Sequence, residues 1–305
     1  MKTKASDGIR RATLFALGLL SLNAAFARPD PLGKDPVGER RGSLQDQAAK
    51  AVSARLIAER VTLTPGKTNW IALTFDIAPK WHLYWHNAGD SGLPISFRVH
   101  APEGVTVGEP LWPTPRRHVS AEIILDYIYE DRVTILLPVE VSGSAAAPPA
   151  GGGMGQVTIG ATVEWLVCRE ACVPGGASVS ASFGVGATGV EGALSTDAPR
   201  FAEARERIPV AHDPSDRGVL TAAFDGATLR IDVPGAESVE FFPYGSEGAQ
   251  PLELIERGTA KGPRIAVSYE QGVVEEKAVR GVVEARHPGQ KPRFWLIVVD
   301  PGAGS

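Results

Sequence analysis

Residues 156–175 read QVTIGATVEWLVCREACVPG, and this stretch decides the fold class. Its first half alternates apolar and polar side chains, which places Val157 and Ile159 on one face of a half-buried β-strand. The strand is expected to end just before Cys168, so that Cys168 and Cys172 occupy the turn that follows. The stretch therefore predicts a β-rich protein that presents its two cysteines at the end of a strand.

The same alternation recurs on both sides of this stretch, and glycine and proline punctuate the segments. A shift to Gly, Ala, Ser and Thr at 184–197 reads as a domain boundary. Neither part shows the alternation of strands and helices that is typical of a thioredoxin-like or Rossmann domain. The pattern predicts an all-β protein of two sandwiches in tandem, a redox-active one at 51–190 with Cys168 and Cys172 and a second at 198–302.

The amino terminus predicts export. Basic residues including Arg10 and Arg11 precede an apolar run at 12–22, and Ala25-Phe26-Ala27 supplies a small-x-small cleavage site. The run is shorter than the roughly 20 residues that a membrane span needs. We therefore expect a cleaved signal peptide at 1–27 and a polar, flexible leader at 28–50.

The composition excludes some partners and bears on the cysteines. The 305-residue chain has a net charge of −4, so no basic field indicates a nucleic-acid partner. In an oxidising compartment the two cysteines can form a disulfide. A stabilising disulfide gains most by closing a long loop, and this one closes a very short loop. A redox-active or metal-binding pair explains the spacing better, although an inert disulfide or two buried thiols remain alternatives.

Several other side chains are candidates for the site. Arg169 favours a thiolate at the neighbouring cysteine, whereas Glu170 opposes it. Glu170 and Pro174 are also candidates for shielding the cysteines or contacting a partner. The first part is rich in aromatic residues, which are expected mainly in the core, while Tyr127 or Tyr129 is a candidate for shielding or for a docking rim. The glycine-containing loop at 87–94 suits a tight turn or a lid over the cysteines.

His82 and His86 raise the question of a metal. On a strand they face the same side but lie about 13 Å apart, at roughly 3.3 Å per residue. That separation is too large for one metal ion unless a bulge or bend intervenes. With a bulge and the two thiolates, they would form a soft Cu(I) site, and the alternative function is therefore a copper-binding or copper-tolerance module. The principal interpretation needs no cofactor and no metal, because the sulfur atoms hold the electrons.

Residues 163–175, VEWLVCREACVPG, resemble the cysteine segment of the amino-terminal periplasmic domain of DsbD-like thiol:disulfide interchange proteins, above all the ScsB (suppressor of copper sensitivity) branch. The resemblance extends to other segments of the chain. These are WHLYWHNAGDSGLPISFRV (81–99), LWPTPRRH (111–118), LDYIYEDRVTILLPVEV (125–141) and, more weakly, VEFFPYG (239–245) and FWLIVVD (294–300).

The resemblance implies immunoglobulin-like sandwiches and an electron-relay role in the periplasm. A transmembrane electron-transfer domain would pass reducing equivalents to a thioredoxin-like donor domain, which would reduce the cysteine pair. The pair would then reduce exported thioredoxin-fold acceptors, with Cys172 joined to partners in mixed disulfides and Cys168 resolving them. The expected protein is a thiol–disulfide oxidoreductase, either separate or tethered to the inner membrane as part of a larger protein.

Overall fold

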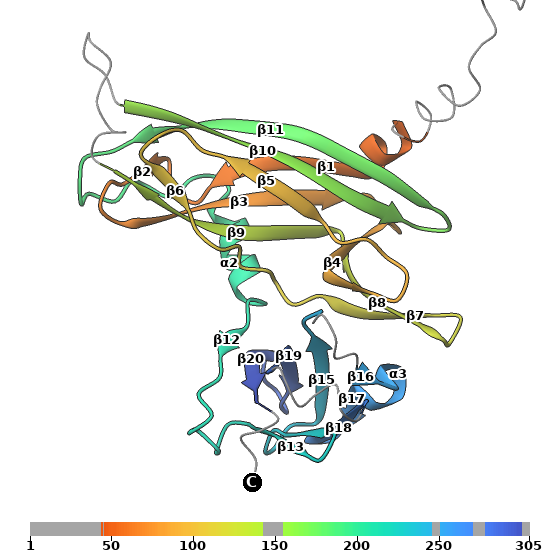
Figure 1. Cartoon of the computed structure of the whole chain (residues 1–305). Coiled ribbons are helices and arrows are strands. Elements are labelled where there is room, and N and C mark those ends of the chain that lie inside the picture. The colour runs from red at the N-terminus through yellow and green to blue at the C-terminus, as the bar shows by residue number, and fades with distance from the viewer. Residues whose placement is uncertain (1–43, 45, 143–154, 246–250, 271–277, 301–305) are drawn as a thin grey trace, which may run out of the picture.

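The computed structural model describes residues 44, 46–142, 155–245, 251–270 and 278–300. Within these residues the chain forms two successive β-sandwiches with few helical turns (Figure 1). The predicted all-β fold of two tandem immunoglobulin-like sandwiches is confirmed. The predicted signal peptide, 1–27, and residues 28–43 of the predicted leader lie outside the described residues.

The first sandwich packs a four-stranded sheet against a larger one. The four-stranded sheet has the order β1 (Val52–Ala58), β3 (Thr68–Ile77), β9 (Arg132–Val141) and β6 (Val105–Val107). The facing sheet has the order β2 (Thr62–Leu63), β11 (Cys172–Val185), β10 (Gly155–Cys168), β4 (His82–Gly89), β8 (Ile124–Glu130) and β7 (Arg116–Ser120), with β5 (Ser96–His100) also paired to β10.

The β10–β11 hairpin is the longest feature of this sandwich. The two strands pair in unbroken antiparallel register from Gly155 and Val185 to Cys168 and Cys172. On β10, alternate side chains from Val157 onward are buried, as the sequence pattern predicts. The hairpin therefore carries the cysteines at one end of a continuous ladder whose inner face belongs to the core.

The second sandwich follows a short helix, α2 (Ala198–Arg205). One sheet has the order β12 (Val210–Ala211), β20 (Arg293–Val299), β19 (Val279–Arg286), β15 (Ser238–Pro243) and β17 (Thr259–Lys261). The other has the order β13 (Thr221–Asp225), β14 (Thr228–Asp232), β18 (Arg264–Tyr269) and β16 (Pro251–Leu252), and the helical turn α3 (Leu254–Arg257) follows β16.

The two sandwiches are joined by apolar packing and by hydrogen bonds. Phe242, on β15 of the second sandwich, is fully buried within the core cluster of the first and lies 5.7 Å from the Tyr127 ring. Asn87 Nδ2 donates a hydrogen bond of 2.7 Å to the Pro243 carbonyl oxygen. Arg117 donates another of 2.6 Å to the Leu254 carbonyl oxygen. The second sandwich thus packs beneath β4 and β8, the strands next to the cysteine hairpin (Figure 1).

Two segments differ from the sequence-based expectation. Residues 46–50, expected at the end of a flexible leader, are helical, because Ala48 and the adjoining Ala51 bury their methyl groups in the first core. The helix α2 lies within 198–302, the range predicted for the second domain. Its residues Phe201 and Ala204 nevertheless pack against β1, β3 and β9 of the first sandwich. Burial of these small and aromatic side chains outweighs the polar character of both segments.

Candidate redox site

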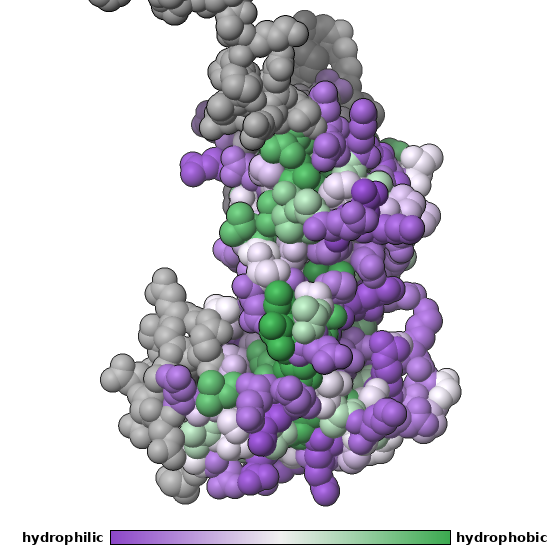
Figure 2. Space-filling view, turned by 90° about the vertical axis from the view of Figure 1, so that its right-hand side faces the viewer, coloured by the Kyte–Doolittle hydropathy of each residue, from purple (hydrophilic) through white to green (hydrophobic). Residues whose placement is uncertain are grey.

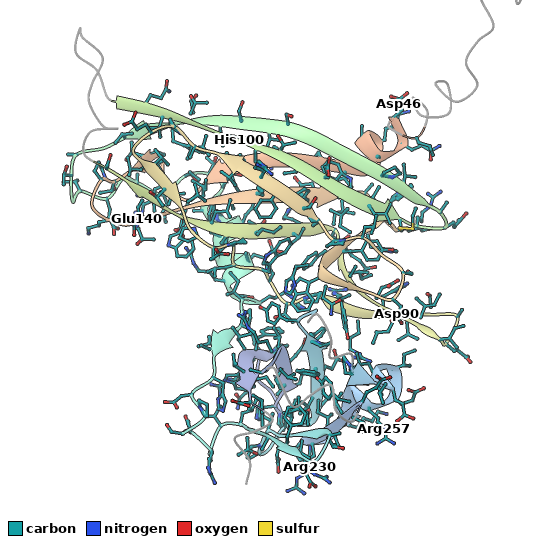
Figure 3. All side chains as sticks on the ribbon, in the orientation of Figure 1. Asp46, Asp90, His100, Glu140, Arg230 and Arg257 are labelled. Carbon is teal, nitrogen blue, oxygen red and sulfur yellow. A yellow bond between two sulfur atoms is a disulfide. The ribbon has the colours of Figure 1, made fainter. Side chains whose placement is uncertain are left out.

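Cys168 and Cys172 form a disulfide at the end of the β10–β11 hairpin (Figure 3). Cys168 is the last residue of β10 and Cys172 is the first residue of β11, and their Cα atoms are 4.1 Å apart. The backbone of Arg169 donates to the carbonyl oxygen of Ala171, which closes the turn between them. Register of the hairpin therefore brings the two sulfur atoms together without any help from distant segments.

The two cysteines differ in exposure. Cys168 is 3% exposed and packs in a small apolar cluster with Tyr84, Ala88 and Ile128. Cys172 is exposed at the surface. Thiol–disulfide exchange requires access of the attacking thiolate to a sulfur atom, so an incoming protein thiol reaches Cys172 rather than Cys168.

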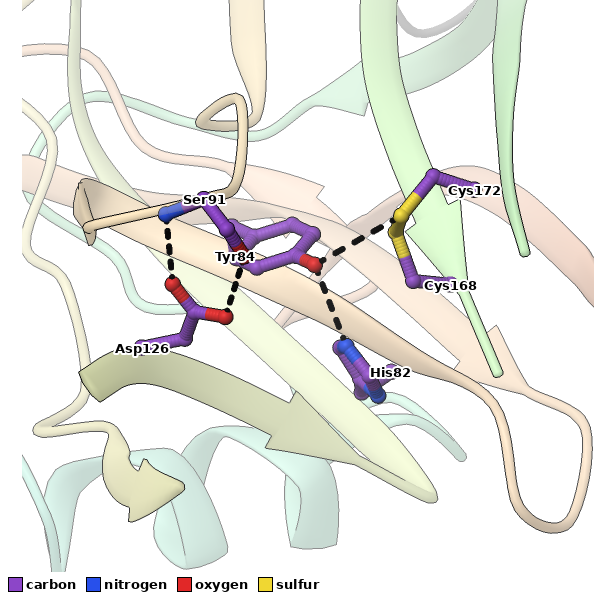
Figure 4. The surroundings of a disulfide bond; sticks show 6 residues. All are labelled: His82, Tyr84, Ser91, Asp126, Cys168 and Cys172. Atoms are coloured by element: carbon purple, nitrogen blue, oxygen red, sulfur yellow. Dashed lines mark hydrogen bonds between the residues drawn. A yellow bond between two sulfur atoms is a disulfide. The ribbon is translucent and has the colours of Figure 1, made fainter. Parts of the chain in front are cut away.

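Tyr84 is in contact with both halves of the disulfide, because it packs with Cys168 and its hydroxyl lies near Cys172 Sγ. Its hydroxyl oxygen lies 3.9 Å from Cys172 Sγ and 3.2 Å from His82 Nε2 (Figure 4). The ring comes from β4, next to β10 in the sheet, and is 2% exposed. Burial raises the pKa of Tyr84 above its ordinary value, so its hydroxyl keeps its proton at neutral pH.

The loop that follows β4 packs on the other side of Tyr84. The Asp126 carboxylate accepts hydrogen bonds from the backbone nitrogen of Ser91, 2.9 Å, and from its hydroxyl, 2.6 Å (Figure 4). A methyl group added at Gly92 would lie 2.1 Å from the Tyr84 ring. The loop is thus held by the buried Asp126 carboxylate. It is in direct contact with Tyr84, whose hydroxyl lies near Cys172 Sγ.

The first sandwich, which carries the disulfide, is similar in sequence to a known protein family. Residues 52–183 match the family model described as thiol:disulfide interchange protein DsbD, N-terminal. This segment therefore resembles the DsbD amino-terminal domain family. A sequence search among curated proteins gives no match.

Two solved structures extend the comparison. The N-terminal periplasmic domain of ScsB from Proteus mirabilis is 16% identical, with a TM-score of 0.51, over 82% of this chain and 92% of that domain. It therefore has the same fold across both sandwiches. The reduced DsbD N-terminal domain of Neisseria meningitidis is 14% identical, with a TM-score of 0.26, over 47% of this chain and 91% of that chain.

The matched family indicates the general chemistry. Domains of this family act in thiol–disulfide exchange through a redox-active cysteine pair rather than a bound cofactor, and they work with thioredoxin-like partners. No helix among the residues described has the length and apolar character needed to cross a membrane.

The structure places two of the residues predicted to shield the cysteines or contact a partner, Tyr127 and Tyr129, in the interior. Tyr127 and Tyr129 are 1% and 6% exposed and belong to the main core, so neither presents a surface to a partner. The Tyr129 hydroxyl donates to the Pro113 carbonyl oxygen instead. The two tyrosines share a face of β8, and that face points into the sandwich, whereas the intervening Ile128 packs beside Cys168.

Glu170 and Pro174 are both exposed and lie two residues before and after Cys172. Their role in shielding the cysteines or contacting a partner stays a prediction. Pro174 also lines an open groove of about 1010 Å³. The helical residues before β1, the loop after β4 and the hairpin form its walls, which include Leu44, Ala48, Leu93, Pro94 and Trp165. A groove with apolar walls thus begins two residues from Cys172, at Pro174.

The two histidines weighed as metal ligands have separate surroundings. His82 lies against Tyr84 and His118, whereas His86 is stacked on Tyr244 of the second sandwich at 4.3 Å. Burial lowers the pKa of His86 to about 3, so it is neutral between the sandwiches. Within the described ranges, no group of three or more His, Cys, Asp and Glu side chains is arranged to hold a metal ion.

Substitution of Gly92 by alanine tests the contact between the loop and Tyr84. The added methyl group overlaps the ring, so either the loop or Tyr84 must move away from the disulfide. We expect faster reduction of the disulfide by a small thiol such as dithiothreitol, by about threefold or more, because access limits exchange. Gly218→Ala is the control, because a methyl group added in this exposed turn before β13 would lie 3.6 Å from the nearest atom, Asp216 Oδ1. An unchanged reduction rate would show that this contact does not limit access.

Proposed function

We propose that this chain relays reducing equivalents in the periplasm, accepting them from a thioredoxin-like donor and passing them to exported thioredoxin-fold proteins. The observation that supports this is the pairing of an exposed sulfur, Cys172, with a buried one, Cys168, in one disulfide. The export signal expected at 1–27 and the periplasmic location of the ScsB domain of similar fold support the compartment. The source of the electrons would be a transmembrane electron-transfer domain behind the donor.

The exchange proceeds in two steps on each side of the relay. In reduction, a donor thiolate attacks Cys172 Sγ, the Cys168–Cys172 bond breaks, and Cys168 leaves as a thiolate that takes up a proton. The second thiolate of the donor then attacks the donor sulfur that is bonded to Cys172 Sγ, which forms the donor disulfide and releases Cys172. The donor becomes a disulfide, and the domain holds two thiols, two electrons and two protons more than before.

Transfer to an acceptor runs through the same sulfur atom. The Cys172 thiolate attacks the acceptor disulfide and forms a mixed disulfide, and one acceptor sulfur leaves as a thiolate. Cys168 then attacks Cys172 Sγ, restores the internal disulfide and frees the second acceptor sulfur. Because Cys168 is buried beside Cys172, it is placed to resolve the complex and poorly placed to start it.

The face around Cys172 suits docking of another protein. Exposed apolar side chains lie in the loop after β4 and in the β7–β8 hairpin, namely Leu93, Val119 and Ile123, which are 62%, 44% and 75% exposed. Figure 2 shows the side of the molecule toward which the ends of both hairpins point, and apolar patches lie among polar ones there. Apolar surface rimmed by polar residues is typical of protein interaction sites.

Trapping of a mixed disulfide tests the assignment of roles. Cys168→Ser leaves Cys172 free to attack but removes the resolving thiol, so incubation with an oxidised thioredoxin-fold protein should yield a stable covalent complex. Cys172→Ser retains only the buried thiol and should give little or none. Mass spectrometry of the non-reduced complex identifies the linked residues. Complex formation through Cys168 in preference to Cys172 would contradict the proposal.

A further inference from the structure

A continuous chain of polar atoms leads from the exposed sulfur to an imidazole. Cys172 Sγ lies 3.9 Å from the Tyr84 hydroxyl oxygen, which lies 3.2 Å from His82 Nε2 (Figure 4). Both aromatic residues lie on β4, which pairs with the end of β10 so that His82 is directly opposite Cys168. The sheet register therefore places the His82 imidazole near the disulfide, although β4 and the cysteine hairpin are far apart in sequence.

We propose that Tyr84 and His82 form an acid–base relay that removes and returns the proton of the Cys172 thiol. This inference rests on the proposed function, because it takes Cys172 as the sulfur that exchanges with partners. In this relay Tyr84 contacts the reacting sulfur, and His82 is a positioning residue that acts through Tyr84.

The proton balance of the relay is closed. The thiol of Cys172 gives its proton to the Tyr84 oxygen, while the Tyr84 hydroxyl gives its own proton to His82 Nε2. The products are a thiolate that accepts a hydrogen bond from Tyr84 and an imidazolium that donates one to the Tyr84 oxygen. The reverse transfer protonates the sulfur when Cys172 is released as a leaving group. The forward step adds one N–H bond to His82 and removes the S–H bond of Cys172, and the reverse step restores both groups.

Charged groups from neighbouring strands surround His82. Burial, followed by the nearby His118 of β7, lowers the pKa of His82, while Asp126 and Glu130 of β8 act in the opposite direction. His82 is therefore a neutral acceptor at pH 7. On the β10–β11 turn, Arg169 stacks over the Trp81 ring at 5.1 Å. A thiolate forming beside Tyr84 adds negative charge and favours the imidazolium.

Single-thiol variants allow the relay to be measured without any partner. In the Cys168→Ser protein, the rate of alkylation of Cys172 by iodoacetamide between pH 5 and 10 reports its thiolate fraction. Tyr84→Phe keeps the ring over the sulfur but removes the hydroxyl, and His82→Gln removes the proton acceptor. Each is expected to raise the pKa of Cys172 by about one unit, which slows alkylation at pH 7 about tenfold.

The double variant and a matched histidine distinguish a relay from two separate effects. Because the two residues act in series, Tyr84→Phe with His82→Gln should slow alkylation no more than Tyr84→Phe alone. His100→Gln replaces another histidine of the first sandwich, on β5, which is bonded to Thr162 rather than to the site, and should leave the profile unchanged. Thermal unfolding of each variant confirms that the fold is retained.

Two results would overturn the relay. One is an unchanged pH profile in folded His82→Gln and Tyr84→Phe proteins, and the other is a fully additive effect in the double variant. Neither result bears on the trapping of partners by Cys168→Ser, which tests the exchange role of Cys172 itself. The reverse outcome is also distinguishable. If Tyr84→Phe and His82→Gln slow alkylation as expected but Cys168→Ser traps no partner, the proposed function is refuted and the proton relay stands.

Discussion

Replacing either cysteine by serine should reduce electron transfer to a partner disulfide to the uncatalysed background. The reduced wild-type domain carries two thiols and can oxidise them together, whereas each single variant holds one thiol and cannot form the internal disulfide that completes the transfer. Mixing the reduced domain with an oxidised thioredoxin-fold protein and counting alkylated acceptor thiols by mass spectrometry measures the transfer.

The two variants should fail in different ways. Cys168→Ser is expected to stop at the covalent complex, and Cys172→Ser is expected not to begin. Loss of the disulfide should lower the free energy of unfolding by only about 2 kcal/mol, because the loop that it closes is short. The variants will therefore be folded, and the loss of transfer is attributable to chemistry. Full transfer activity in both single variants would exclude the exchange role of the pair.

Phe242→Ala should give a large loss of stability away from the cysteines. The ring is fully buried and belongs to the second sandwich, yet it packs in the core cluster of the first. Truncation of a buried phenylalanine costs about 3–5 kcal/mol. Because the cavity lies between the sandwiches, the loss should lower the unfolding temperature and should also increase hydrogen exchange in β4 and β8, next to the cysteine hairpin.

Phe224→Ala is the matched control for this prediction. Phe224 is a buried phenylalanine of β13 whose neighbours lie within the second core, where its ring is 5.7 Å from that of Tyr269. Its truncation should destabilise the second sandwich and leave exchange in β4 and β8 unchanged. Equal protection of β4 and β8 in the two alanine variants would show that the sandwiches are not coupled through Phe242.

The local features of the site could be predicted from the sequence. Alternation along 156–166 identifies the strand, and the sequence correctly places the cysteines at its end, although they are the strand residues that flank the turn rather than residues of the turn itself. The likeness of 163–175 to DsbD-like proteins indicates the chemistry, and the family-model match over 52–183 confirms that resemblance. These are conclusions about short segments, for which sequence carries most of the information.

The surroundings of the cysteines could not be predicted in the same way. Alternation separates Tyr127 and Tyr129 from Ile128, but it does not say which set faces the hairpin. That choice depends on the pairing of β4 with β8 and β10, between segments that are about 40 or more residues apart. The same pairing puts Tyr84 rather than Tyr127 in contact with the disulfide, and the sequence shows only that both are tyrosines.

The ladder behind the cysteines sets how the domain changes between its oxidised and reduced forms. Fourteen residue pairs hold β10 and β11 in register up to the sulfur atoms, so breaking the S–S bond frees only the turn between Cys168 and Cys172. A carrier built in this way undergoes little structural reorganisation each time it is loaded or unloaded. Under the proposed function, partners would then sense its redox state through the sulfur atoms and the side chains that touch them, rather than through a change in overall shape.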